Sequence, residues 1–98
     1  MEPQKISVDR YVLDSLMVDL VGHDRRPSAY ILYLALHRLG AARKEIGISL
    51  QGLATATGLS KTAVQRSVAH LVRRQLISAR AAGWTEAPYY QVLQPWRR

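Results

Sequence analysis

The chain has 98 residues, 48% of them apolar, which suits one folded domain and argues against a disordered chain. It contains no cysteine, which excludes a disulfide framework, a thiolate zinc site and a cysteine nucleophile. There are 14 Lys and Arg residues against 7 Asp and Glu. Residues 51–98 contain seven of the Lys and Arg residues, and Glu86 is the single acidic residue there. Such a lopsided charge favours a polyanionic partner at the second half of the chain.

The first predicted element is a helix over residues 8–21, capped by Ser7 and ended by Gly22. One apolar stripe on its wheel is formed by Val8, Val12, Leu13, Leu16 and Leu20. A helix with one buried face needs only one stripe, yet Tyr11 and Val18 lie on another side, with Met17 and Val21 between. Two interpretations stay open for this second side. We favour contact with a second copy of the chain; the alternative is that the next helix wraps around it within one subunit.

Pro27 suits a helix start, and residues 28–39 are predicted to form a second helix that Gly40 ends. This helix is apolar nearly all round, which is typical of a central helix packed on several sides. Tyr30 and Tyr33 are interpreted as core residues whose hydroxyls reach the edge, in preference to an aromatic binding site.

The next stretch predicts a helix-turn-helix followed by a hairpin. Residues 46–48 alternate as a short edge strand, and Ser49 caps a helix over residues 50–57 with Leu53 and Ala54 facing inward. Gly58 supplies the positive φ of a tight turn, and Ser60 caps a helix over residues 61–74. Strands are expected at residues 76–82 and 89–93, joined by a turn-rich tip at residues 83–88.

The helix over residues 61–74 has two different faces. Its inward face carries Val64, Val68, Leu71 and Val72, with Ser67 beside them. Its outward face has no acid and carries Thr62, Arg66, Ala69 and Arg73, flanked by Lys61, Gln65 and His70. His70, beside this face, is expected to be solvated, with a contact to phosphate as the alternative. The outward face opens with Ser60, Lys61 and Thr62, where free backbone N–H groups favour phosphate. In a DNA major groove, Arg66 suits guanine, Gln65 suits adenine, and Thr62 suits a thymine methyl or a phosphate.

Leu53, Ala54, Gly58, Leu59 and Val64 stand at the spacing of the helix-turn-helix signature. With the preceding helix, the edge strand and the hairpin, residues 28–93 resemble bacterial winged-helix DNA-binding domains of the MarR-like and phage or plasmid replication-protein types. The resemblance implies an α+β fold, mainly α with a small β-hairpin, for residues 28–93. With the extra N-terminal helix predicted at residues 8–21, we expect a single winged-helix domain over residues 1–98. The resemblance also implies that the groove positions are Ser60, Lys61, Thr62, Gln65, Arg66 and Ala69.

The sequence departs from this family pattern in two places. The hairpin tip lacks Lys and Arg and contains Glu86, so we expect a weak contact of the hairpin with DNA, from Arg80 at its base. Trp84 in the tip is expected to pack on a partner or to fold back on the hairpin. No long helix follows the hairpin, so dimerisation is expected to fall to residues 8–21.

Several functions lack their usual sequence signals. His23, His37 and His70 are far apart and have no metal-ligand spacing, so no metal or cofactor is expected. There is no glycine-rich phosphate loop and no nucleophile elbow, so we expect no enzyme activity. The N-terminus lacks the pattern of a secretory signal, and the longest apolar run, residues 29–36, is too short to span a bilayer. A cytoplasmic, nucleoid-associated protein without a membrane partner is expected.

The leading hypothesis is a small bacterial transcriptional regulator that binds double-stranded DNA sequence-specifically as a homodimer. A second hypothesis is a DNA-binding module of phage or plasmid replication or partition. A third is a winged-helix protein-interaction module without DNA binding, which the acid-free face of residues 61–74 argues against.

Overall fold

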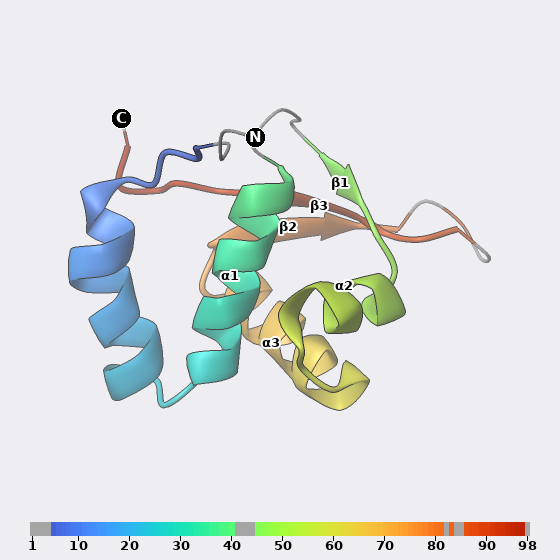
Figure 1. Cartoon of the computed structure of the whole chain (residues 1–98), viewed down its shortest axis with the longest axis horizontal. Coiled ribbons are helices and arrows are strands. Elements are labelled where there is room, and N and C mark those ends of the chain that lie inside the picture. Colours follow the sequence, from blue (N-terminus) through green and yellow to red (C-terminus); the bar gives the residue numbers. More distant parts are fainter. Residues whose placement is uncertain (1–4, 41–44, 82, 84–85, 98) are drawn as a thin grey trace.

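The computed structural model describes residues 5–40, 45–81, 83 and 86–97, in which helices cover one face of a small sheet. Along the chain the order is η1 (Val12–Leu16), η2 (Val18–His23), α1 (Pro27–Leu39), β1 (Ile46–Gly47), α2 (Leu50–Thr57), α3 (Lys61–Arg73), β2 (Ile77–Arg80) and β3 (Tyr89–Val92). Helix α1 stands between the N-terminal helical segment and the α2–α3 pair (Figure 1). This is the predicted α+β winged helix-turn-helix with an extra N-terminal helix.

The N-terminal helical segment, residues 10–23, differs from the prediction in its start, end and type. Most of it is π-helical, as in the i→i+5 hydrogen bond from Asp24 N–H to the Asp19 carbonyl at 2.7 Å. The prediction that Gly22 ends the helix was wrong, because these wide turns continue through Gly22 to His23. A π-helix also has more residues per turn than an α-helix. The buried side chains are therefore Val12, Leu16 and Leu20, whereas Leu13, predicted in the same stripe, is 50% exposed.

Helix α1 is the central helix that its composition predicts. Pro27 occupies its first turn, and Leu32, Tyr33 and Leu36 are fully buried. The Tyr30 hydroxyl donates to the Val12 carbonyl at 2.9 Å, and the Tyr33 hydroxyl donates to the Leu93 carbonyl at 3.1 Å. Burial raises the pKa of both phenols, so both remain donors. The interpretation of the two tyrosines as core residues is confirmed, and their hydrogen bonds hold the N-terminal segment and the end of β3 against α1.

The helix-turn-helix follows the predicted caps and turn. Ser49 Oγ accepts from the Gly52 N–H, and Ser60 Oγ accepts from the Ala63 N–H, both at 3.0 Å. Gly58 has φ +79°, the left-handed conformation predicted for this position. The sequence did not reveal the part of Thr57, whose Oγ1 donates to the Leu53 carbonyl at 2.7 Å and accepts from the Leu59 N–H at 3.1 Å. These contacts fix the angle at which α3 leaves α2.

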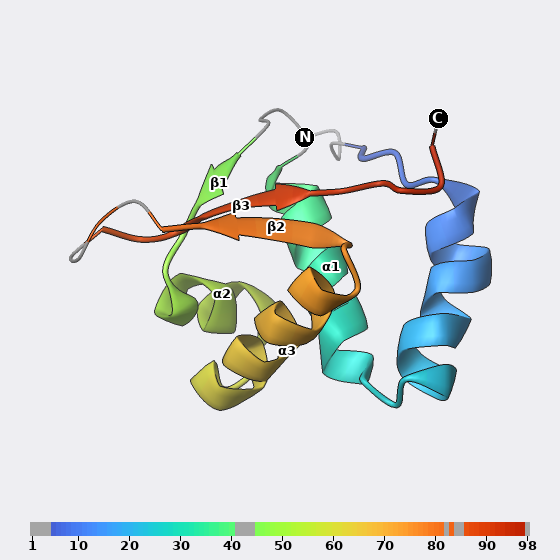
Figure 2. The same cartoon turned by 180° about the vertical axis from the view of Figure 1, so that it is seen from behind.

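The sheet is antiparallel in the order β1–β3–β2, with β3 in the centre. Tyr90 on β3 is opposite Ile46 on one side and Ala79 on the other. The predicted edge strand is present as β1. Strands β2 and β3 are shorter than the predicted strands at residues 76–82 and 89–93, although the Leu93 N–H still donates to the Leu76 carbonyl at 2.9 Å. Strands β2 and β3, which lie side by side in the view from behind, form the hairpin of the wing (Figure 2). The segment that leads into β3 extends beyond α2.

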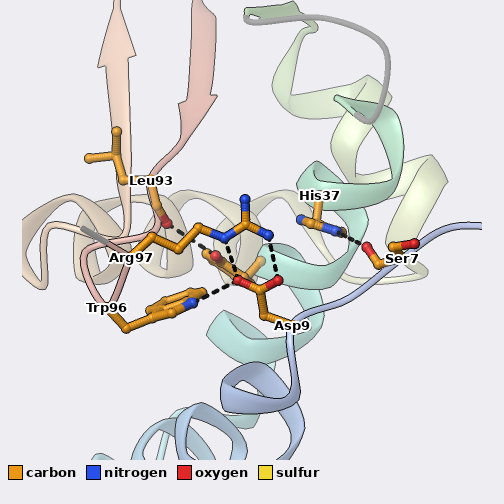
Figure 3. A network of polar contacts seen from close by, with 7 residues as sticks. Ser7, Asp9, His37, Leu93, Trp96 and Arg97 are labelled. Carbon is orange, nitrogen blue, oxygen red and sulfur yellow. Dashed lines mark hydrogen bonds and ion pairs between the residues drawn. The ribbon is translucent and has the colours of Figure 1, made fainter.

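The segment after β3 packs on the N-terminal segment, a contact that the sequence did not predict (Figure 3). The Trp96 ring stacks on Tyr11 with centroids 4.6 Å apart, and Trp96 Nε1–H donates to Asp9 Oδ2 at 2.9 Å. Arg97 donates to both oxygens of Asp9, with Nε at 2.6 Å from Oδ2. His37 Nε2–H donates to the Ser7 carbonyl at 2.8 Å, so residues before the helix are also fixed.

Candidate nucleic-acid interface

The outward face of α3 is exposed along its whole length. Val64 and Leu71 are fully buried and Ser67 is 3% exposed, so these residues fix the rotation of the helix about its axis. The predicted inward position of Val72 was wrong: it lies near the end of α3 and is 39% exposed. The six predicted groove residues and Arg73 of the same outward face are all exposed: Ser60, Lys61, Thr62, Gln65, Arg66, Ala69 and Arg73. Three of their side chains carry positive charge and none carries negative charge.

The first turn of α3 offers donors to an anion. Ser60 Oγ accepts the Ala63 N–H as an N-cap, and its own hydroxyl hydrogen remains available for donation. In the part of the chain that the structure describes, the N–H groups of Lys61 and Thr62 have no backbone acceptor, as expected at a helix start. With the positive end of the helix dipole, this turn suits a phosphate oxygen.

His70 lies in a different environment from the one predicted. It was expected to be solvated or to reach a phosphate, but its side chain is 12% exposed and its Nε2–H donates to Asp24 Oδ2 at 2.8 Å. Arg74 Nε forms an ion pair with the same oxygen, at a distance of 3.0 Å. The hydrogen bond from His70, then that from His23 and the charge of Arg74, lowers the pKa of the Asp24 carboxyl, against the opposing effect of burial. His70 therefore anchors α3 to Asp24, the residue that follows η2, and is not part of the exposed outward face of α3.

Arg26 joins this surface although sequence reasoning did not select it. With Arg66, Ala69, His70 and Arg73 it lines a shallow hollow of about 320 Å³ beside α3. Its guanidinium comes from the connector between η2 and α1, forty residues before Arg66 in the sequence. The adjacent basic residues Arg25 and Arg26 were the sequence signal that could have indicated this contribution to the surface. The connector's path, with Arg25 at φ +55°, decides that Arg26 is near α3.

Arg80, the predicted contact at the base of the wing, is paired within the chain. Its Nε and Nη2 donate to the two oxygens of Glu45 at 3.2 and 3.1 Å, and its guanidinium lies 4.7 Å from the centroid of the Tyr89 ring. The hydrogen bonds to Glu45 raise the pKa of Arg80. Glu45 therefore compensates this charge in the free protein, which weakens its expected attraction to phosphate. Glu86 in the tip is exposed, and Trp84 lies outside the described residues.

The second apolar side of the N-terminal segment is open to solvent. Of its predicted residues, Val18 is 63% exposed, and Tyr11, Met17 and Val21 are also exposed. Leu13 joins them because the π-helical turns move it out of the core. Helix α1 does not wrap around this side within the subunit. Tyr11 is the exception in the group, since one face of its ring is stacked on Trp96.

Metal sites and membrane-spanning helices are absent from the described ranges. No group of three or more His, Cys, Asp or Glu there is placed to hold a metal ion. No helix within those ranges has the length and apolar character needed to cross a membrane.

The comparisons with known proteins agree with this architecture. The chain is similar to a solved structure of a MarR family transcriptional regulator from Silicibacter pomeroyi DSS, with a TM-score of 0.57 and 16% sequence identity. The match covers 87% of this chain and 54% of the other, so the chain spans about half the length of that regulator. No protein-family model matches the sequence, and no curated protein matches it. The likeness therefore concerns the fold: the chain has the winged helix-turn-helix fold of a MarR family regulator.

Proposed function

We propose that the protein binds double-stranded DNA sequence-specifically, as a small bacterial transcriptional regulator, with α3 in the major groove. One observation carries the proposal: the exposed face of α3 displays Lys61, Arg66 and Arg73 and no carboxylate. A major groove admits one α-helix, and its walls are phosphates that attract this charge. The structural neighbour is a transcriptional regulator, which supports the same role for this fold.

The exposed face of α3 is proposed to make two kinds of contact, one with the DNA backbone and one with base edges. Ser60, Lys61 and Thr62 in the first turn suit phosphate or a thymine methyl, which positions the helix. Gln65 and Arg66 are the long side chains nearest the middle of the exposed face, so they suit the base edges of adenine and guanine. Ala69 is small enough to let the backbone of α3 approach the DNA closely.

A second copy of the chain is the proposed partner of the N-terminal segment. Tyr11, Met17, Val18 and Val21 form an exposed apolar side on a helix that packs on α1 with its other side. A two-fold dimer through this side repeats α3, which predicts a palindromic site with half-sites about one helical turn apart. Such a regulator works on the bacterial nucleoid, in the cytoplasm.

Selection of duplexes from a random pool tests the proposal, followed by fluorescence anisotropy on the selected and an unrelated duplex at two salt concentrations. We expect one enriched palindromic motif and an affinity that falls steeply with salt. Binding that is absent, or that does not depend on salt, contradicts the proposal. Binding without any enriched motif retains the DNA contact but contradicts sequence recognition.

A further inference from the structure

The connector between η2 and α1 holds the backbone of Arg26 in place. The Arg26 N–H donates to the Leu20 carbonyl at 2.7 Å, and the Arg26 carbonyl accepts from the Ala29 N–H at 3.0 Å. Arg26 is also the residue before the first turn of α1, where Pro27 follows it. Its side chain is exposed, so a fixed backbone presents a guanidinium to solvent.

Asp24, two residues earlier, fastens the same connector to α3. Its Oδ2 accepts a hydrogen bond from His70 and forms an ion pair with Arg74, as described above. The side chains of Asp24 and His70 are both close to 90% buried. The connector therefore does not move freely relative to the second half of α3. Arg26 keeps a defined position next to Arg73, which lies one turn beyond Ala69 on the same helix.

Three arginines, Arg26, Arg66 and Arg73, line one shallow hollow together with Ala69 and His70. No carboxylate is among the described residues that line it. Within the described chain, none of the three guanidinium groups forms an ion pair. Like charges at close range repel one another, and no described residue that lines the hollow supplies a carboxylate to compensate them. The Asp24 carboxylate, two residues before Arg26, is already engaged by His70 and Arg74. An anion from outside the chain relieves this repulsion.

We propose that this hollow binds one phosphate of the DNA backbone, held by Arg26 and Arg73, while Arg66 at the rim reaches a base edge. The planar guanidinium presents paired N–H donors that match two phosphate oxygens, so arginine suits this contact better than lysine. The inference rests on the proposed DNA binding and adds a contact from outside the helix-turn-helix. A phosphate held beside the second half of α3 determines how deeply the first half of this helix enters the major groove.

Arg26→Ala tests the inference, with Arg38→Ala as the matched control. Arg38 is exposed in the last turn of α1, the helix that Arg26 precedes, about 18 Å along the helix axis from Arg26. Its substitution removes the same formal charge. Anisotropy is measured on the selected duplex and on an unrelated duplex over a range of salt concentrations. We expect Arg26→Ala to bind both duplexes about tenfold more weakly, with a salt slope lower by about one. Arg38→Ala should match the unaltered protein.

A further variant, Arg26→Lys, separates charge from geometry. It should keep the salt slope of the unaltered protein and lose part of its affinity, because an ammonium group cannot make the paired contact. If Arg26→Ala behaves like Arg38→Ala, the phosphate site is wrong although the proposed function stands. A changed preference between the duplexes instead of a uniform loss also overturns it. If the unaltered protein binds no duplex, the proposed function fails first and this inference fails with it.

Discussion

His70 Nε2 on α3 lies 2.8 Å from Asp24 Oδ2 at the end of η2, and both side chains are nearly buried. The two residues are 46 positions apart and belong to helices with different proposed tasks. The N-terminal segment offers the surface proposed for a second copy, and α3 offers the surface proposed for DNA. The contact between them makes the spacing of two α3 helices in a dimer depend on a short, defined path through Asp24.

Asp24→Asn should destabilise the fold, because it weakens the hydrogen bond from His70 and removes the ion pair with Arg74 in a poorly solvated contact. We expect the free energy of unfolding to fall by about 1–3 kcal/mol. Urea unfolding followed by circular dichroism measures it. Asp14→Asn is the control, since Asp14 pairs with Arg10 on the open surface, where an ion pair contributes about 0–1 kcal/mol. Equal effects of the two substitutions would show that Asp24 has no special role.

Asp9 should titrate at unusually low pH. The hydrogen bond from Arg97, then that from Trp96, lowers the pKa of its carboxyl from 3.8 to about 2. Because the pKa is lower in the folded chain, this stabilisation is complete above pH 3.8 and is lost as the pH falls through about 2. In Arg97→Ala the pKa should rise towards 3.8, as measured by the carboxyl ¹³C shift of Asp9 in NMR. Arg38→Ala should leave the pKa of Asp9 unchanged. If Arg97→Ala also leaves it unchanged, the contact between Asp9 and Arg97 is refuted.

Gly58 is the glycine whose replacement should cost stability through the backbone alone. Its φ is +79°, and a Cβ added there would meet nothing within 4 Å. Gly58→Ala should therefore lower the free energy of unfolding by about 1–2 kcal/mol, and Gly58→Asn by less, because asparagine tolerates the left-handed conformation better. Thermal or urea unfolding of the two variants gives this order. The reverse order would mean that a clash, and not the conformation, sets the cost.

The helix-turn-helix was predictable because its signals are local. Serine caps, a turn glycine and the spacing of Leu53 and Val64 act over a few residues, and they place the exposed face of α3 correctly. The N-terminal segment was predicted less well. Its apolar residues were arranged on an α-helical wheel, whereas π-helical turns rotate Leu13 out of the core and carry the helix past Gly22.

The remaining features depend on residues that meet only in the folded chain. Asp24 meets His70, Glu45 meets Arg80, and Asp9 meets Arg97 across separations of 46, 35 and 88 residues. No periodicity indicates such pairs. They changed the candidate site in two ways: His70 and Arg80 are occupied within the chain, and Arg26 is added from the connector.

Arg66→Ala and Gln65→Ala should change which DNA sequence is bound. Each side chain is exposed on the middle of α3, and a good bidentate base contact contributes about 1–3 kcal/mol of discrimination. We expect the preference for the selected duplex over point-substituted duplexes to shrink at one position per half-site for each variant. Competition anisotropy measures this, and circular dichroism checks that the fold is intact. If neither variant alters affinity or preference, the groove assignment of this face is incorrect.

Val18→Asp should separate two copies of the chain without unfolding either one. Val18 is 63% exposed, so the fold does not depend on its burial, whereas a carboxylate in the middle of an apolar interface is strongly unfavourable. We expect sedimentation equilibrium to give a dimer for the unaltered protein and a monomer for Val18→Asp. The monomer should bind an isolated half-site as before and lose the added affinity for the palindrome. Ile31→Asp is the control, since Ile31 is an exposed apolar residue on α1. If Val18→Asp remains a dimer, or the unaltered protein is a monomer, the contact between copies lies elsewhere or does not form.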